Sequence, residues 1–370
     1  MAKHIYCHIP FCAAKCPYCD FYSEAGRDGE CVSRLIEAMC REISSYEADD
    51  VISTIYIGGG TPSFIDSAHI ERLLDTIRGR FTAAEDCEIT IEVNPSSLTE
   101  DKALKYKAAG VNRVSVGVQS LHDKHLATLG RLHDASKAID CINILKETGF
   151  GNISADLIIA VPGQSTDDAL EDLNTLARMG VKHISTYSLS IEHGTPFFAR
   201  YGDTIEDLVP PEEERRMYHT LRSELERLGY IPYEISNSCR PGFESRHNSS
   251  YWEGEEYYGI GAGAHGYVDG IRYAHPDDID SYIGDPFTTE TEEVMDEDSA
   301  MHEYPFLKLR TSEGVDLKEF AERFGREFTD VFGEIVRENV NKGLLTAGSG
   351  HVRLTDKGID WSNAVMSGFL

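Results

Sequence analysis

Short apolar runs rich in β-branched residues alternate with stretches of helical periodicity along the first half of the chain. The apolar runs predict six strands, at residues 4–9, 52–57, 88–93, 113–118, 153–159 and 183–189. The stretches between them predict helices, among them 31–46, 68–78, 99–109, 135–147 and 166–179. This alternation indicates an α/β fold of parallel βα units, either an open (β/α)6 partial barrel or a doubly wound sheet. In both architectures ligands bind at the carboxyl ends of the strands.

The pattern changes after about residue 200. A Pro-Pro pair followed by three glutamates predicts a helix that reaches residue 228, and a glycine- and aromatic-rich stretch follows at 230–273. An acidic run at 290–298 predicts a domain junction. The remaining residues predict three helices, a hairpin at 344–354 and a final helix, which is the order of a winged helix. We therefore expect a core at 1–236, a connecting segment at 237–290 that completes the site, and a smaller winged-helix-like α+β domain at 291–370.

Charge and hydropathy narrow the classes of function. Acidic residues outnumber basic ones 63 to 35, which gives a formal net charge of −28. A field of that sign repels phosphate backbones and anionic lipids, so we expect no nucleic-acid partner and a C-terminal domain that packs against the core. No apolar run is long enough for a membrane span, and the first residues lack the apolar stretch of a signal peptide. The expected location is cytoplasmic.

Four of the nine cysteines crowd into residues 7–19, whereas the other five are scattered. An odd number of cysteines without an export signal predicts no disulfide framework. Cys12, Cys16 and Cys19 form a CxxxCxxC motif, which has too few thiolates for a tetrahedral zinc site. Three thiolates can hold three corners of a [4Fe–4S] cluster and leave one iron open for the methionine moiety of S-adenosylmethionine. The alternative is a zinc site that recruits His4, His8 or Cys7.

The cysteine loop resembles that of the radical-SAM superfamily. The segment Tyr-x-His-Ile-Pro-Phe-Cys at 6–12 narrows the resemblance to the family that contains oxygen-independent coproporphyrinogen III dehydrogenase. The resemblance implies the partial barrel, the cluster and S-adenosylmethionine. Residues 58–62, Gly-Gly-Gly-Thr-Pro, resemble the family's methionine-binding motif. The residues that match family contacts to S-adenosylmethionine are Tyr6, Tyr18, Gly59, Gly60, Thr61, Glu92, Gln119, Arg131, Asp156 and Ser188, together with His265, where the dehydrogenase has an apolar residue.

Other segments are more similar to the HemW-type heme chaperones than to the dehydrogenase. The dehydrogenase continues its motif to a fourth cysteine, where this chain has Phe21, and it has a longer segment before the residue that matches Tyr6. The similarity to the chaperones lies in HNxxYW at 247–252, in 187–196, in 241–248 and in 353–358, whereas Lys308 stands where glycine is expected. The resemblance implies heme as a ligand and apo-hemoproteins, such as respiratory oxidoreductases, as partners. It also implies a homodimer and at most transient contact with membrane-bound clients.

His247 is the candidate for contact with heme, since imidazole is a common axial ligand of heme iron. The alternative is a hydrogen-bonded histidine that orders a loop. The favoured function is a heme chaperone that binds heme and transfers it to apo-hemoproteins, with S-adenosylmethionine turnover left open. The first alternative is oxidative decarboxylation of coproporphyrinogen III. Radical cleavage of heme and a winged-helix regulator that senses through its cluster are further alternatives, the latter disfavoured by the acidic charge.

Overall fold

The computed structural model describes residues 3–47, 50–202 and 204–370, and its main feature is one strongly curved sheet. All six predicted strands are present and neighbouring ones pair in parallel. They are β1 (Lys3–Ile9), β4 (Val51–Gly59), β5 (Thr82–Val93), β6 (Arg113–Gln119), β7 (Asn152–Ile159) and β8 (His183–Ser188). The spatial order of these strands follows their order in the chain.

Further strands extend both ends of this parallel sheet, and the sequence pattern did not predict them. On one side β11 (Tyr257–Ile260) pairs in parallel with β1, and three antiparallel strands follow it. These are β12 (His265–Val268), β13 (Ile271–Ala274) and β14 (Glu290–Val294). On the other side β10 (Asn237–Cys239) and β9 (Ile231–Pro232) pair antiparallel beyond β8. The strands of the glycine-rich segment are short, which explains why their periodicity was too brief to recognise.

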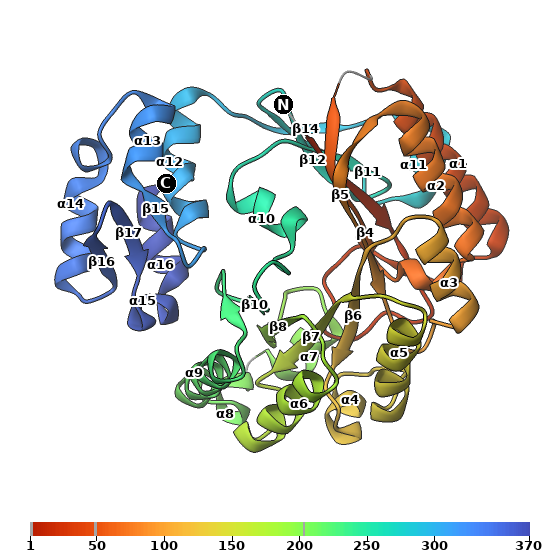
Figure 1. Ribbon diagram of the computed structural model, residues 1–370, viewed down its shortest axis with the longest axis horizontal. Coiled ribbons are helices and arrows are strands. Elements are labelled where there is room, and N and C mark those ends of the chain that lie inside the picture. Colours follow the sequence, from red (N-terminus) through yellow and green to blue (C-terminus); the bar gives the residue numbers. More distant parts are fainter. Residues whose placement is uncertain (1–2, 48–49, 203) are drawn as a thin grey trace.

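The helices between the parallel strands cover the convex side of the sheet (Figure 1). The predicted ones are α1 (Gly29–Ser45), α2 (Ser67–Arg80), α3 (Glu100–Ala108), α5 (Ala135–Glu147), α6 (Thr166–Arg178) and α9 (Pro211–Arg227). The shorter ones are α4 (Asp123–Thr128), α7 (Pro196–Tyr201), α8 (Ile205–Leu208), α10 (Arg246–Trp252) and α11 (Ile279–Gly284). Thr99 caps α3 as expected, by accepting a hydrogen bond from the backbone of Lys102. Helix α10 lies on the concave side (Figure 1). Because the parallel strands follow their chain order and the helices between them cover one side, the architecture is the open partial barrel.

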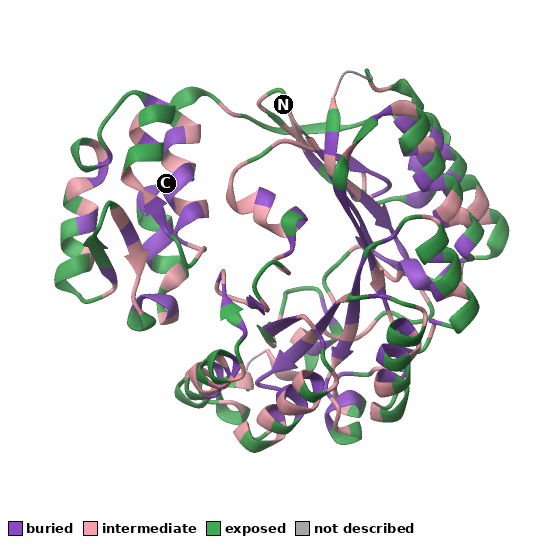
Figure 2. Cartoon of the chain, in the orientation of Figure 1, coloured by how far each residue is buried: buried purple, intermediate pink, exposed green. Residues whose placement is uncertain are grey.

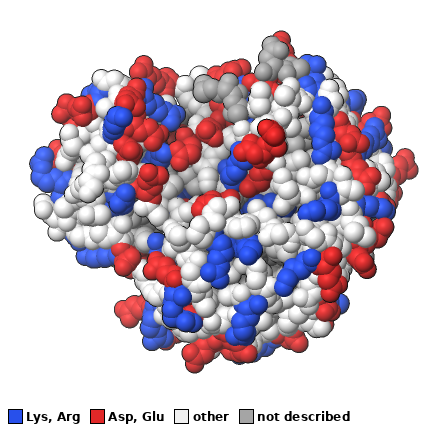
Figure 3. Space-filling model, in the orientation of Figure 1, with Lys and Arg blue, Asp and Glu red and all other residues white. Residues whose placement is uncertain are grey.

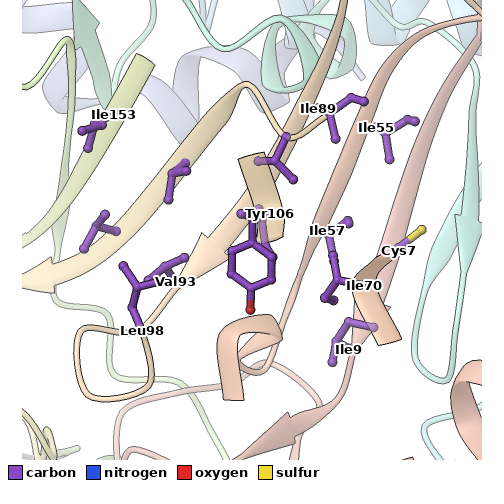
Figure 4. Close-up of a cluster of buried hydrophobic side chains, with 14 of the residues drawn as sticks. Cys7, Ile9, Ile55, Ile57, Ile70, Ile89, Val93, Leu98, Tyr106 and Ile153 are labelled. Carbon is purple, nitrogen blue, oxygen red and sulfur yellow. The ribbon is translucent and has the colours of Figure 1, made fainter. Parts of the chain in front are cut away.

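Each parallel strand separates an apolar face from a polar one. On β1 the side chains of Ile5, Cys7 and Ile9 are fully buried toward the helices and belong to the large apolar core. Figure 4 shows Cys7 and Ile9 in this cluster. The alternate residues of the parallel strands face the concave side and are mostly polar. They include His4, Tyr6, Thr54, Tyr56, Glu88, Thr90, Glu92, Arg113, Ser115, Ser154, Asp156, His183 and Ser185. Figure 2 shows the strands buried along most of their length, so both faces are covered. The period of two therefore builds a core outside the barrel and a polar interior within it.

The C-terminal residues form a separate unit in the order of a winged helix. The elements are α12 (Glu297–Lys308), β15 (Val315–Asp316), α13 (Leu317–Phe324), α14 (Phe328–Asn341), β16 (Leu345–Gly348), β17 (His351–Leu354), α15 (Asp356–Asp360) and α16 (Ser362–Met366). Phe320, Phe328, Phe332 and Phe369 pack in a core of its own. The sequence pattern missed the two-residue strand β15 and predicted one final helix where the structure has α15 and α16. The acidic run forms β14 at the edge of the large sheet and then caps α12 through Asp296.

The C-terminal unit faces the open side of the barrel, with α10 between the two (Figure 1). Lys308, which departs from the expected glycine, is buried, and its ammonium pairs with Glu253 at the end of α10 and with Glu319 at 3.4 Å. Arg310 lies 3.1 Å from the buried carboxylate of Glu234. On the face of the molecule that Figure 3 shows, acidic side chains gather over the upper part and basic ones lie below the centre. Among the described residues, no helix combines the length and apolarity that a bilayer span requires.

Candidate functional site

A cavity of about 510 Å³ lies on the concave side and reaches the carboxyl ends of the parallel strands. It gathers most of the residues that the sequence singled out, and they come from seven separate segments. These are Tyr18, Cys19, Gly59, Gly60, Thr61, Glu92, Gln119, Arg131, Asp156 and Ser188. Carboxyl ends of neighbouring parallel strands meet at one edge, which is why residues more than 100 positions apart converge there.

The cysteine loop borders this cavity. The Cys12 sulfur lies 3.3 Å from the Thr61 hydroxyl, and the Cys16 sulfur accepts a hydrogen bond of 3.5 Å from the Arg131 guanidinium. Cys19 lines the cavity itself. All nine cysteines lie within the described residues and none is in a disulfide, as expected. The three motif thiols therefore lie beside one cavity, on the loop that the first strand ends in.

The residues needed for the alternative zinc site have other partners. Both ring nitrogens of His4 lie within hydrogen-bond distance of Thr54 and Glu255. The two ring nitrogens of His8 lie within hydrogen-bond distance of the Tyr6 hydroxyl and the backbone carbonyl of Tyr22. Cys7 is fully buried in the apolar core on the other side of the strand. The donor set beside the cavity is thus three thiols, the set that an iron–sulfur cluster with one open iron requires.

The glycine turn after β4 is joined to the cysteine loop by backbone hydrogen bonds. The Gly60 and Thr61 amides donate to the carbonyls of Ile9 and Phe11, at 2.9 and 2.8 Å. A Cβ atom on Gly60 would lie 2.8 Å from the Phe11 carbonyl oxygen. Gly59 has φ +108° in the left-handed region, and its missing side chain leaves room for the ring of His8. Glycine is therefore required sterically at both positions.

Two buried carboxylates line the cavity deeper in the barrel. Burial raises the pKa of Glu92 to about 7, although the Tyr56 hydroxyl donates to it at 2.7 Å, and the nearby Asp156 raises the pKa further. Burial also raises the pKa of Asp156, opposed by hydrogen bonds from the Ser185 and Ser115 hydroxyls at 2.8 and 3.1 Å. Carboxylates held in this way are suited to accept hydrogen bonds from the hydroxyl groups of a ligand.

Gln119 and Arg131 supply polar atoms that the protein leaves unpaired. Gln119 is a non-glycine residue with φ +64°, and its buried Oε1 atom has no partner among the described residues. The two Nη atoms of Arg131 donate to Cys16, Tyr18 and the Gly117 carbonyl, whereas its buried Nε atom is unpaired. Unpaired buried polar atoms are costly, so these residues fit a site that is completed by a polar ligand.

Besides Cys12 and Cys16, which border the cavity without lining it, three singled-out residues lie off it. Tyr6 does not line it but stacks beside Tyr56. His265 is exposed on β12 and pairs with Glu292 at 3.0 Å. His247 is 1% exposed, and its ring nitrogens lie 2.6 Å from the Thr54 Oγ1 and 2.9 Å from the Tyr251 hydroxyl. Burial lowers the pKa of His247 well below its ordinary value, so the ring is neutral. In this structure both nitrogens are engaged within the protein, and a heme iron reaches neither without breaking these contacts.

Several cavity residues were missed by sequence reasoning. They are Tyr56, Asn94, Arg113, Ser115, Ser185, Tyr187 and Asn248. The sequence signal that could have identified several of them is the alternation of polar and apolar residues within the predicted strands, as in Arg-Val-Ser-Val at 113–116. The polar residues of this alternation are the ones that line the cavity. Such alternation normally marks a strand with one face in solvent. Only the closure of the curved sheet shows that the polar face turns inward.

Comparisons with known proteins agree with this arrangement. Residues 6–176 match the radical SAM superfamily model, and residues 295–361 match the model of the HemN C-terminal domain. Coproporphyrinogen III oxidase (HemN) from Escherichia coli, described as a radical SAM enzyme, superposes with a TM-score of 0.86 over all of this chain and 90% of its own. The two sequences are 21% identical, so this likeness shows the fold.

Similarity in sequence is greater to proteins named heme chaperone HemW. The one from Lactococcus lactis is 37% identical over 99% of this chain and 96% of its own length. Those from Bacillus subtilis and Escherichia coli are 36% and 32% identical, over 100% and 99% of this chain and 99% and 97% of their own. The chain therefore belongs to the HemW family of the radical-SAM superfamily.

Proposed function

We propose that this protein is a heme chaperone, which binds heme and transfers it to apo-hemoproteins on a scaffold that carries one [4Fe–4S] cluster and S-adenosylmethionine. The observation that carries the proposal is the near full-length similarity to proteins named heme chaperone HemW. The clients we propose are apo-hemoproteins such as respiratory oxidoreductases, with at most transient contact with clients that are bound to the membrane. The chain is proposed to act as a homodimer.

The cavity supports the proposed cofactors. Cys12, Cys16 and Cys19 would hold three irons of the cluster, and the open fourth iron would supply the electron that cleaves the sulfonium of S-adenosylmethionine. The Gly59–Gly60 turn would admit the methionine end of the ligand. Glu92 and Asp156 would accept hydrogen bonds from its hydroxyl groups, and Arg131, beside Cys16, would compensate part of the negative charge of the cluster thiolates.

The same set of cofactors is compatible with two functions, that of a heme chaperone and that of a coproporphyrinogen III dehydrogenase. The similarity in fold to coproporphyrinogen III oxidase does not favour the dehydrogenase function. The two sequences are only 21% identical, and at that identity a common fold does not indicate a common activity. Phe21 stands where the dehydrogenase motif has a further cysteine, and its ring is 68% exposed at the cavity. An exposed aromatic ring offers apolar area to a flat macrocycle, which is compatible with heme binding.

One anaerobically reconstituted sample tests both functions. Heme-loaded protein is mixed with an apo-hemoprotein, and transfer is followed by the absorbance of the acceptor's heme, against free heme at the same concentration. The same sample is incubated with coproporphyrinogen III, a reductant and S-adenosylmethionine, and the porphyrin products are separated. We expect transfer faster than from free heme and no decarboxylated product. Absence of transfer together with decarboxylation would replace the chaperone by the dehydrogenase.

A further inference from the structure

Arg113 is a buried cation that the proposed cofactor set does not use. Its side chain is 1% exposed, yet it lines the cavity, and its Nε atom is buried without a partner. Among the described residues it forms neither an ion pair nor a side-chain hydrogen bond. Taking a guanidinium out of water without a partner costs several kcal/mol, so such a group points to a counter-charge that arrives from outside.

The carboxylates nearest to Arg113 in the cavity are committed to other groups. Glu92 accepts from the Tyr56 hydroxyl and the Gly59 amide, and Asp156 accepts from two serine hydroxyls. The positive charge of Arg113 favours ionisation of both, but neither is within ion-pair distance. Arg131, the other cation that lines the cavity, donates to Cys16 and Tyr18 instead. Among the described residues, Arg113 is therefore a lining cation whose guanidinium has neither an ion pair nor a side-chain hydrogen bond, whereas Arg131 has only its Nε atom unpaired.

Helix α10 brings a second donor to the same end of the cavity. Arg113 pairs in register with Thr90 on β5, and two residues earlier on that strand Glu88 accepts from the backbone amides of Arg246 and His247. The next residue, Asn248, lines the cavity and is half-buried, and its side-chain amide has no hydrogen bond within the described residues. The first turn of α10 thus lies over the part of β5 and β6 where Glu88 and Arg113 are located, and Arg113 is at the amino end of β6.

We propose that Arg113 and Asn248 form a carboxylate-binding subsite at the α10 end of the cavity, distinct from the cysteine end. A planar guanidinium beside an amide NH2 group matches the two oxygens of a carboxylate. The carboxylate we propose for it is a propionate of heme, because the methionine carboxylate of S-adenosylmethionine is proposed above for the open iron at the cysteine end. That methionine carboxylate is the other source which the test distinguishes. The subsite rests on the proposed function only for the identity of these ligands.

Binding measurements on the reconstituted holoprotein test the subsite and separate the two sources. Arg113→Gln and Asn248→Ala are compared with wild type for heme, heme dimethyl ester, S-adenosylmethionine and methylthioadenosine, which lacks the carboxylate. Loss of one charge-assisted pair is expected to weaken binding about tenfold or more. Weaker binding of heme with unchanged binding of its ester assigns the propionate, and weaker binding of S-adenosylmethionine with unchanged binding of methylthioadenosine assigns the methionine carboxylate.

The controls keep a folding defect apart from a binding defect. Asn248→Ala removes a half-buried side-chain amide that forms no hydrogen bond within the described residues, so the variant should fold normally. Arg113→Lys retains the positive charge and should therefore retain part of the affinity. Equal loss for the carboxylate-free ligands, or no loss for any ligand, would overturn the subsite. If wild type binds no heme, the proposed function is wrong. The comparison of S-adenosylmethionine with methylthioadenosine then still shows whether Arg113 and Asn248 bind a carboxylate.

Discussion

The Nδ1 atom of His247 lies 2.6 Å from the Oγ1 atom of Thr54, a residue 193 positions earlier in the chain. The same hydroxyl lies 2.8 Å from His4, so one threonine on β4 joins the first strand to helix α10. The ring of His247 also stacks on Tyr56, with 5.1 Å between centroids. These contacts place α10, and with it Asn248, over the cavity.

His247→Ala should lower the free energy of unfolding by about 2–4 kcal/mol, because it removes a buried ring and leaves Thr54 and Tyr251 with lost contacts. The matched variant Thr54→Val breaks the same contact without touching the HNxxYW motif. If His247 acts by positioning α10, both variants should weaken heme binding to a similar extent in a titration. Loss confined to the His247 variant would instead identify direct contact with heme.

Cys12→Ala should abolish the visible absorbance of the cluster and reduce the iron content from about four per chain, because two thiolates cannot hold the cubane. Cys31→Ala is the control, since this cysteine is partly exposed on α1 and lies outside the motif. Iron analysis and absorbance spectra of anaerobically reconstituted protein provide the measurement. An unchanged spectrum for Cys12→Ala would refute the ligand set.

Gly60→Ala should destabilise the protein by about 1–3 kcal/mol and abolish binding of S-adenosylmethionine, because the new methyl group would meet the Phe11 carbonyl at 2.8 Å. Gly79→Ala is the matched control, since this glycine lies inside α2 with no atom within 4 Å of an added Cβ. The control should be more stable than wild type by about 0.5–1 kcal/mol. Thermal unfolding and calorimetric titration measure both effects, and equal behaviour of the two variants would contradict the steric role of Gly60.

Glu92 should make the ligand-free protein lose stability as the pH rises. Its pKa is about 7 in the folded protein against 4.5 as an ordinary value, so the folded state holds a proton that the unfolded state releases between these values. The contribution is present below pH 4.5 and is lost as the pH rises through 7. The free energy of unfolding of Glu92→Gln, relative to that of wild type, should therefore be higher at pH 8 than at pH 5, by up to about 2–3 kcal/mol. Urea unfolding at both values measures this, and a pH-independent difference would refute the shift.

Lys308→Met should loosen the C-terminal domain from α10, because Glu253 and Glu319 would lose the ammonium between them. Breaking such a partly buried pair should cost about 1–3 kcal/mol. Limited proteolysis between the domains should be faster than in wild type, whereas Lys318→Met, at an exposed pair on α13, should change nothing. Equal proteolysis of the three proteins would assign docking to the Arg310–Glu234 contact and the apolar packing instead.

The local pattern of the chain determined much of this protein. Apolar β-branched runs specified the six parallel strands, periodic stretches specified the helices with caps such as Thr99, and the spacing of Cys12, Cys16 and Cys19 specified a three-thiolate loop. These features depend on neighbouring residues, whose preferences act over one turn or one strand. The convergence of strand ends on one edge follows from parallel βα order, which is why most of the residues singled out from the sequence meet at one cavity.

Only the tertiary structure decided which way the polar faces turn and what the HNxxYW segment does. The alternation around Arg113 is the same whether that face meets solvent or an enclosed interior, and the curvature that encloses it arises from the twist and pairing of the whole sheet. His247 looked like a ligand because imidazole binds iron, but its partners Thr54 and Tyr251 become neighbours only when α10 docks against β4. Contacts between distant segments carry no local signature, so the burial of His247 and the exposure of Asn248 to the cavity could be read only from the folded chain.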